Sequence, residues 1–306
     1  MGTPEFAVKA LEELLNAKYN IVGVITAPDK PAGRGRKIRP SAIKIFAEQH
    51  GLNILQPSNL KDVVFLDQLR ALEADLQIVV AFRMLPKVVW NMPKIGTFNL
   101  HASLLPEYRG AAPINWAIIK GETKTGVTTF FINEKIDTGS ILLQEQIEIL
   151  DTMDVGDLHD KLMVLGSELI LKTVELLKTG NFELKAQPSN GLKIAPKLNR
   201  DNCKIDWTDS LDNIHNKIRG LSPYPGAWTF LINNDEKIEV KIYDSDNISE
   251  QHNFECGKII TNKKEIKVAV KNGFLKILNL KIAGKRRMDA TSLLNGYSFK
   301  KESKML

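Results

Sequence analysis

The chain has 306 residues, of which 43% are hydrophobic and 25% are charged, and its formal net charge is +6. This length predicts two domains, because single hydrophobic cores rarely grow beyond about 250–300 residues. The composition is typical of globular proteins, and no apolar run reaches the roughly 18 residues of a membrane span. Without a visible secretory leader, we expect a cytoplasmic protein. Cys203 and Cys256 match no zinc or redox spacing, so we expect no metal site.

The charge is unevenly distributed. Residues 1–190 contain 21 Lys and Arg against 22 Asp and Glu, whereas residues 191–306 contain 21 against 14. A neutral first part joined to a basic second part indicates a polyanionic partner that is bound mainly by the second part. A lysine-rich solvated surface is the alternative, and charge alone does not decide between the two.

The first part alternates helical and strand patterns. Helices are predicted around residues 6–17, 41–50, 61–73, 112–120 and 155–178, and apolar strands at 20–26, 76–82, 95–101 and 126–132. Near-continuous apolar strands between helices are typical of a mostly parallel sheet covered on both faces. We therefore expect an α/β, Rossmann-like domain over residues 1–183.

Residues 184–200 are punctuated by Pro, Asn and Gly, and we expect a linker there. After it, the sequence predicts short strands at 227–232, 236–244, 257–262, 265–271 and 274–282. Five short strands indicate a small β-barrel in residues 201–306, with an oligonucleotide-binding-like (OB-like) barrel as one candidate. The last eight residues are expected to be frayed.

Two polar side chains stand at the end of a predicted buried strand, in the stretch "FNLHASLLP" (98–106). Because side chains alternate along a strand, Asn99 and His101 point to the same face. The carboxyl end of a parallel strand borders the ligand crevice of such folds. An Asn amide suits a developing oxyanion, and a His can accept or donate a proton. A hydrogen-bonded pair that merely closes the strand is the alternative.

An acid that could orient the histidine occurs in "EKIDTGSILLQ", as Asp137 in a turn before another strand. No Ser or Cys stands beside Asn99 and His101 as a protein nucleophile, so the set fits direct transfer of an acyl group to a nucleophile on the substrate. Asp-Thr-Gly also occurs in aspartic proteases, but these need two such carboxylates, and this chain has one copy. A local Asx-turn is the other interpretation of Asp137.

The segment "PDKPAGRGRKIRPSAIK" (28–44) contains six basic residues and no acid between Asp29 and Glu48. It lacks the Gly-Lys-Ser/Thr end of a P-loop and the Gly-x-Gly-x-x-Gly of a nicotinamide-binding fold. A basic loop with two glycines suits contact with a phosphate backbone. A solvated surface loop is the alternative.

Taken together, these segments resemble the methionyl-tRNA formyltransferase family. The resemblance rests on "GTPEFAV" (2–8), "PDKPAGRGRK" (28–37), "FNLHASLLPEYRGAAPINWAI" (98–118), "IDTGSIL" (136–142) and "LSPYPGAW" (221–228). It implies 10-formyltetrahydrofolate as the formyl donor and methionyl-initiator tRNA as the acceptor. Nothing in the sequence demands more than a monomer, which is the state we expect. The resemblance implies a catalytic trio of Asn99, His101 and Asp137. It also implies folate contacts from Ser103, Leu104, Leu105 and Pro106, and it places Arg34 near the acceptor end of the tRNA. We expect Arg36 and Lys37 of the same basic loop to contact the tRNA as well.

The chain departs from the family pattern in two places. The family has an apolar strand ahead of "GTPEF", so we expect that Met1 corresponds to an internal methionine or that the chain is truncated. Arg83 stands where the family usually has a small residue, near the expected folate pocket.

Two alternatives to this function are a formyltransferase with another amine acceptor, such as a nucleotide sugar or a purine precursor, and a catalytically impaired tRNA-binding scaffold. The basic loop and the basic second part argue against the first, and retention of Asn99, His101 and Asp137 argues against the second.

Overall fold

The computed structural model describes residues 1–32, 37–188, 192–234 and 236–306. The chain separates into two compact units. Unit 1 comprises Met1–Gly110, Gly126–Ile147 and Asp160–Ile194, and unit 2 comprises Ala111–Thr125, Glu148–His159 and Ala195–Leu306. The domain limits drawn from the sequence, 1–183, 184–200 and 201–306, stay predictions.

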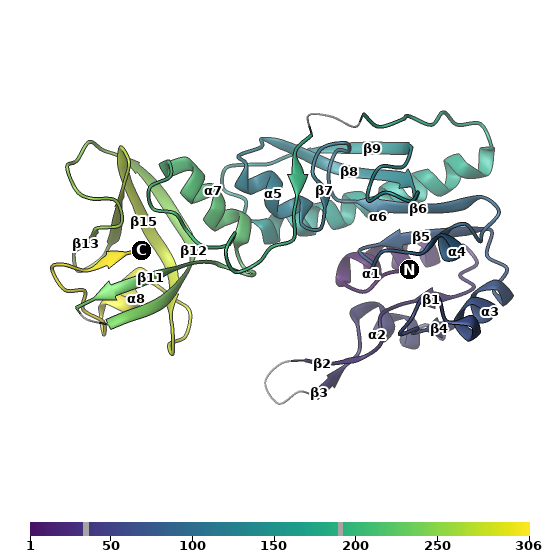
Figure 1. The fold of residues 1–306 in the computed structure, drawn as a ribbon, viewed down its shortest axis with the longest axis horizontal. Coiled ribbons are helices and arrows are strands. Elements are labelled where there is room, and N and C mark those ends of the chain that lie inside the picture. The colour runs from purple at the N-terminus through teal and green to yellow at the C-terminus, as the bar shows by residue number, and fades with distance from the viewer. Residues whose placement is uncertain (33–36, 189–191, 235) are drawn as a thin grey trace. The chain divides into compact units, whose positions relative to one another are not determined.

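Unit 1 is an α/β domain (Figure 1). Its helices are α1 (Glu5–Asn16), α2 (Ala42–Gln49), α3 (Val63–Ala71), α4 (Lys87–Trp90) and most of α6 (Val155–Thr179). Its strands are β1 (Val24–Ile25), β2 (Lys30–Ala32), β3 (Lys37–Arg39), β4 (Ile54–Leu55), β5 (Leu76–Val80), β6 (Gly96–His101), β7 (Arg109–Gly110), β8 (Lys124–Phe131) and β9 (Ile141–Glu148). The start of α3 is set by Asp62, whose carboxylate accepts the backbone N–H of Phe65 at 3.1 Å, as N-capping residues do.

The predicted parallel sheet is confirmed. Strand β1 pairs in parallel with β4 and β5 with β6, while β6 and β8 run antiparallel. Within the described residues, β5, β6, β8 and β9 form one sheet in that order. Helix α6 packs on one face of this sheet, where Gly166 lies against Leu100 of β6 and Thr173 bonds Thr129 of β8 at 2.8 Å. The opposite face of β6 and β8 is therefore the one available for a site.

The first two residues lie between β1 and β5. The Met1 amine donates to the Ile78 carbonyl at 2.7 Å, and Gly2 bridges Val80 in parallel. Burial lowers the pKa of this amine to about 5. A cavity of about 130 Å³ is lined by Met1 and by residues 20–25 and 76–78. The additional strand ahead of Met1 stays a prediction.

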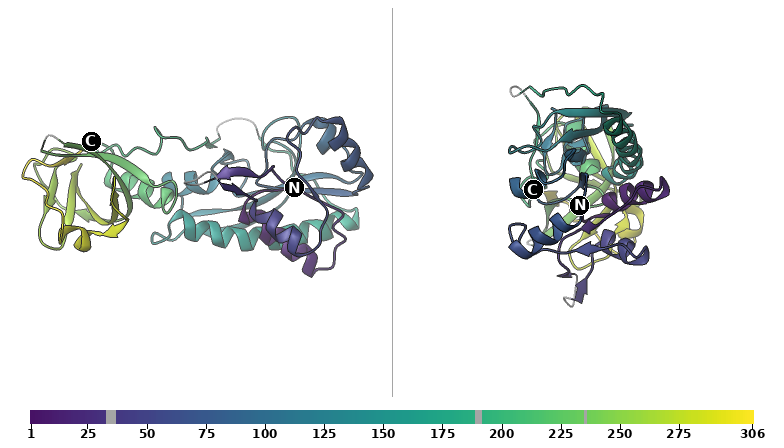
Figure 2. Two further views of the ribbon diagram at one scale, coloured as in Figure 1. Left: turned by 90° about the horizontal axis from the view of Figure 1, so that it is seen from below. Right: turned by 90° about the vertical axis from the view of Figure 1, so that its right-hand side faces the viewer.

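Unit 2 is a nearly closed antiparallel barrel with two helices that were not expected (Figure 2). Its elements are α5 (Pro113–Ile119), β10 (Ile194–Ala195, at the border with unit 1), α7 (Leu211–Leu221), β11 (Ala227–Asn233), β12 (Glu236–Ser249), β13 (Ile259–Thr261), β14 (Ile266–Val270), β15 (Gly273–Ile282), β16 (Met288–Asp289), α8 (Ala290–Leu294) and β17 (Lys304–Met305). The described strands are ordered β13-β14-β15-β12-β11-β17, with β16 paired to β15. The small barrel is thus confirmed.

The prediction of a frayed C-terminus is wrong. Met305 in β17 is 2% exposed and pairs with Leu231 of β11. Its backbone N–H also donates to the Gly257 carbonyl at 2.8 Å, just before β13. The last residues therefore bond both to β11 and to the segment before β13, at the two ends of the strand order. Burial of Met305 in the core keeps this tail ordered although its neighbours in sequence are charged.

Helix α7 was missed although its pattern is readable. The Ser210 hydroxyl accepts the Asn213 backbone N–H at 3.2 Å, and Leu211, Ile214 and Ile218 follow at helical spacing and are buried. A serine cap before apolar residues at i, i+3 and i+7 is a helix-start signal.

Candidate active site

Strand β6 presents Asn99 and His101 on the face opposite α6, as the alternation along the strand predicts. Between them, Leu100 points to the helix side, against Gly166. Asn99 is half-buried, whereas His101 is only 6% exposed. The Phe130 ring of β8 meets the His101 ring edge-on, with centroids 6.5 Å apart. Phe130 therefore forms an apolar wall beside His101, and Asn99 is the more exposed of the two polar side chains.

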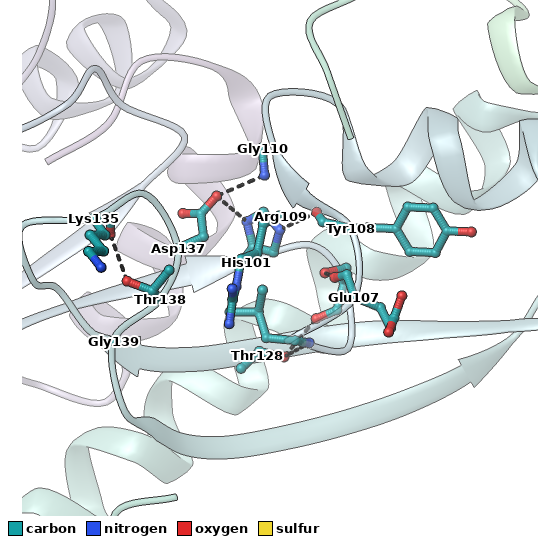
Figure 3. Close-up of polar contacts among 12 residues, drawn as sticks. His101, Glu107, Tyr108, Arg109, Gly110, Thr128, Lys135, Asp137, Thr138 and Gly139 are labelled. Carbon is teal, nitrogen blue, oxygen red and sulfur yellow. Dashed lines mark hydrogen bonds and ion pairs between the residues drawn. The ribbon is translucent and has the colours of Figure 1, made fainter. Parts of the chain in front are cut away.

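The two nitrogens of His101 have different partners (Figure 3). Nε2 lies 2.9 Å from the Tyr108 carbonyl oxygen, and Nδ1 lies 3.8 Å from Oδ2 of Asp137. Because a carbonyl oxygen can only accept, Nε2 carries the hydrogen. Nδ1 is then the nitrogen left to exchange a proton, and an imidazolium formed there would face the Asp137 carboxylate. The hydrogen bond from Nε2 to the Tyr108 carbonyl, rather than the contact with Asp137, therefore fixes the orientation of the His101 ring.

Asp137 is held by a distant part of the chain. Its Oδ2 accepts the backbone N–H of Gly110 at 3.0 Å (Figure 3). Its φ is +52°, in the left-handed region that Asp tolerates better than most residues. The turn that contains Asp137 is closed by Thr138 and not by the Asp137 carboxylate. The Thr138 hydroxyl donates to Asn133 Oδ1 at 3.0 Å. The Asx-turn interpretation therefore does not account for this carboxylate, which faces His101.

Gly139 follows in the motif because the backbone is too close for a side chain. A Cβ at this position would lie 1.6 Å from the Phe131 carbonyl oxygen of β8. The Gly139 carbonyl also accepts from the Gln187 amide at 2.7 Å. Both contacts fix the turn that carries Asp137.

The loop Ser103–Pro106 is anchored to β8 and β9 through Thr128. The Thr128 hydroxyl donates to the Ser103 carbonyl at 2.7 Å and accepts the Leu105 backbone N–H at 3.1 Å. The Gln144 amide donates to Thr128 at 3.0 Å and to the Leu105 carbonyl at 2.8 Å. This network fixes the loop beside His101.

Two of the four predicted folate residues have their side chains turned inward. Ser103 is fully buried, and its hydroxyl donates to the Glu107 carbonyl at 2.6 Å. Leu105 packs with Phe130 and Ile141. Leu104 and Pro106 are half-buried. Sequence reasoning missed Thr128, Gln144 and Tyr108, because their roles depend on which strands become neighbours, and no local motif marks them.

Within the basic segment 28–44, strands β2 and β3 pair antiparallel. Lys37 lies in β3, opposite Ala32 of β2, whereas the other two predicted tRNA contacts, Arg34 and Arg36, lie outside the described residues. Lys44 lies in α2, which follows β3, and donates to Asp29, the residue directly before β2, at 2.6 Å. That bond, and a further one from Gln56, hold the pKa of the Asp29 carboxyl below its usual range.

Arg83, which the sequence placed near the expected folate pocket, is bonded to the loop after β4. Its guanidinium donates to the Ser58 carbonyl at 2.8 Å and to the Pro57 carbonyl, and it lies over the Phe82 ring. It therefore ties the loop after β4 to the loop after β5.

Across the described part of the chain, no three His, Cys, Asp or Glu side chains are grouped so as to share a metal ion. Nor does any helix there have the length and apolar character needed to cross a membrane.

The fold and this site define a formyl transferase. The formyl transferase family model matches residues 1–174, and the formyl transferase C-terminal domain model matches residues 197–298. The chain is similar to the methionyl-tRNA formyltransferase of Flavobacterium johnsoniae, with 58% identity over all of this chain and 97% of the relative. It is also similar to that of Parabacteroides distasonis, with 55% identity over 97% of this chain and 94% of the relative. The chain belongs to the formyl transferase family, in its methionyl-tRNA formyltransferase group.

Solved structures share the same fold. An N-formyltransferase from Helicobacter canadensis, crystallised with folinic acid and dTDP-3-aminofucose, has a TM-score of 0.65 and 22% identity, covering 90% of this chain and 96% of its own. The sugar 3N-formyl transferase WlaRD, crystallised with dTDP and 5-N-formyl-THF, has a TM-score of 0.66 and 21% identity, covering 93% and 97%.

Proposed function

We propose that this protein transfers the formyl group of 10-formyltetrahydrofolate to the α-amino group of methionine on initiator tRNA, for the initiation of translation. The observation that carries the proposal is the placement of Asn99, His101 and Asp137 at the end of β6, with Nδ1 of His101 directed at Asp137. The names of relatives 55–58% identical over nearly the whole chain support the acceptor.

The donor is assigned to a folate because relatives of this fold have been crystallised with folate derivatives. We assign its contacts to the loop Ser103–Pro106. Because the Ser103 hydroxyl is already bonded to Glu107, that residue contributes through the loop backbone. The half-buried Leu104 and Pro106 are left to contribute apolar contacts.

The chemistry divides among the three side chains. The methionyl amine, as the neutral nucleophile, attacks the formyl carbon, and a tetrahedral intermediate with a negative oxygen forms. The Asn99 amide donates to that oxygen; losing one such donor typically costs about 10²–10³ in rate. Nδ1 of His101 takes the proton released by the attacking nitrogen and delivers it to N10 of the folate as the carbon–N10 bond breaks.

Asp137 serves the cationic stage of this relay. When Nδ1 of His101 is protonated, the imidazolium faces the carboxylate 3.8 Å away, and an opposite charge at that distance in a buried site stabilises the cation. The hydrogen bond from Gly110 keeps the carboxylate in place between turnovers. Asp137 thus acts on the reaction through His101.

The acceptor assignment is tested by a panel of amines offered with the same labelled formyl donor. The panel contains methionyl-initiator tRNA, the same tRNA without its amino acid, free methionine and a dTDP-amino sugar. We expect label only on the charged tRNA. Faster transfer to the amino sugar than to the charged tRNA would refute the proposed acceptor and leave the formyl chemistry intact.

A further inference from the structure

A cavity of about 590 Å³ is lined by residues of unit 2 alone. Its walls come from five parts of unit 2: the start of α5 (Ala111, Ala112 and Asn115), residues 197–200 with Cys203, the turn Tyr224–Gly226, strand β11 (Trp228) and strand β12 (Glu239 and Lys241). Its volume is in the range of pockets that hold a small ligand or one unit of a larger one.

One wall carries an exposed aromatic ring. Tyr224 is 82% exposed, although it lies in the lining of the cavity. Trp228, on the same lining, is 7% exposed and is covered by the Arg200 guanidinium, which lies 4.0 Å above its ring. Of these two aromatic rings, that of Tyr224 is therefore the one on which a flat ligand could stack.

The charged groups of the lining favour an anion. Three cations, Lys197, Arg200 and Lys241, face a single acid, Glu239, which is already paired with Arg200. Lys241 donates one bond to the Pro225 carbonyl at 2.7 Å, and an ammonium group has three donors. Lys197 is exposed at the rim.

An exposed aromatic ring beside uncompensated lysines is the combination that holds single-stranded nucleic acid, in which a base stacks and its phosphate pairs with cations. We propose that this cavity binds one unstacked nucleotide of the acceptor tRNA, with the base on Tyr224 and the phosphate between Lys197 and Lys241. This proposal rests on the proposed function in naming tRNA as the RNA. It adds a second place, outside the catalytic unit, at which the RNA is held.

The test is tRNA affinity in matched variants of the full chain. Tyr224→Ala removes the ring, Tyr224→Phe keeps it without the hydroxyl, and Phe254→Ala removes an aromatic ring of unit 2 that is also exposed but does not line the cavity. Stacking of one base is worth about 1–3 kcal/mol by alanine substitution, so Tyr224→Ala should weaken methionyl-tRNA binding by about 5- to 150-fold. Tyr224→Phe and Phe254→Ala should change it by less than about twofold. Equal binding by Tyr224→Ala and the unaltered protein would overturn the proposal, as would an equal loss in both Tyr224 variants.

The phosphate contact is tested through salt dependence and a mononucleotide. Lys197→Met should reduce the slope of log affinity against log salt by about 1, the effect of one lost phosphate contact. AMP is added as a competitor to distinguish an RNA nucleotide from a free one. If AMP binds in the cavity while tRNA affinity is indifferent to Tyr224 and Lys197, the site serves a free nucleotide and the proposal is wrong.

The binding readout is independent of formyl transfer. A protein that binds tRNA through Tyr224 but transfers no formyl group would contradict the proposed function alone. If the Tyr224→Ala variant formylates methionyl-tRNA and binds it with unchanged affinity, the proposed nucleotide site is wrong and the proposed function stands.

Discussion

Replacing Thr128 by Val would test whether the loop Ser103–Pro106 is positioned by the hydrogen bonds of one hydroxyl. Valine has nearly the same shape, so the packing of this fully buried residue is retained. What is lost is the donor to the Ser103 carbonyl and the acceptor for the Leu105 N–H. The Gln144 amide also loses its bond to Thr128 but keeps its bond to the Leu105 carbonyl. Each buried group left without a partner costs about 1–3 kcal/mol, so we expect a total of about 2–6 kcal/mol, concentrated in this loop.

Two assays measure this cost. Hydrogen exchange read by mass spectrometry should show the Leu105 amide opening at least about tenfold more often, since 1.4 kcal/mol corresponds to a factor of ten. The KM for 10-formyltetrahydrofolate should rise, whereas the KM for methionyl-tRNA should not. A global urea midpoint is less informative, because a chain of two units need not unfold in one step.

The neighbouring residue supplies the control. Thr129 lies on the opposite face of β8, where its hydroxyl pairs with Thr173 of α6 at 2.8 Å. Thr129→Val also removes a buried hydrogen bond, so it should lower stability without raising the KM for the donor. The reasoning is refuted if Thr128→Val leaves that KM unchanged, or if both variants raise it equally.

Three further outcomes are expected. Gly139→Ala should lower the melting temperature by many degrees, because its Cβ would lie 1.6 Å from the Phe131 carbonyl, whereas Gly296→Ala, with no atom within 4 Å, should not; equal melting temperatures would contradict this. Burial, with a smaller effect from Arg219, lowers the pKa of His215, so the unfolded chain binds more protons below pH ~6.5 and stability falls as the pH drops there. His215→Asn should make that fall shallower between about pH 7 and 5.5, and an unaltered slope measured by thermal melts would count against it. Arg83→Met should leave the KM for the donor within about twofold, because the guanidinium bonds Pro57 and Ser58; a tenfold rise in steady-state assays would place Arg83 in the donor site instead.

Local sequence signals predicted the framework of both units. Period-two alternation placed Asn99 and His101 on one face of β6. The cap at Ser210 was readable in the same way, but helix α7, which it starts, was not predicted. Predicted strand ends were less accurate. The run 20–26, for example, pairs as a strand only at Val24 and Ile25, where β4 lies alongside. Pairing partners determine where a strand ends, and a single strand sequence does not contain them.

The residues that hold the loop and the histidine in place could not be predicted from local sequence patterns. Thr128 and Gln144 bond the Ser103–Pro106 loop only because β8 and β9 follow β6 in the sheet order. The sequence predicted that Asp137 orients His101 directly. In the structure, the Tyr108 carbonyl instead accepts the hydrogen bond of His101 Nε2, and Asp137 faces Nδ1, the nitrogen that we assign to proton exchange. Backbone carbonyls leave no trace in side-chain motifs, so this partner was not predictable from residue types.

The most direct test of the account is the rate of a single turnover with the charged tRNA and the formyl donor both saturating. Under these conditions the measured rate reports bond formation and cleavage rather than binding. We predict that His101→Ala and Asn99→Ala each slow formyl transfer to methionyl-initiator tRNA by about 10²-fold or more, with unaltered far-UV circular dichroism. A single-turnover rate within a few-fold of the unaltered protein in either variant would contradict the assignment of the active site to the end of β6.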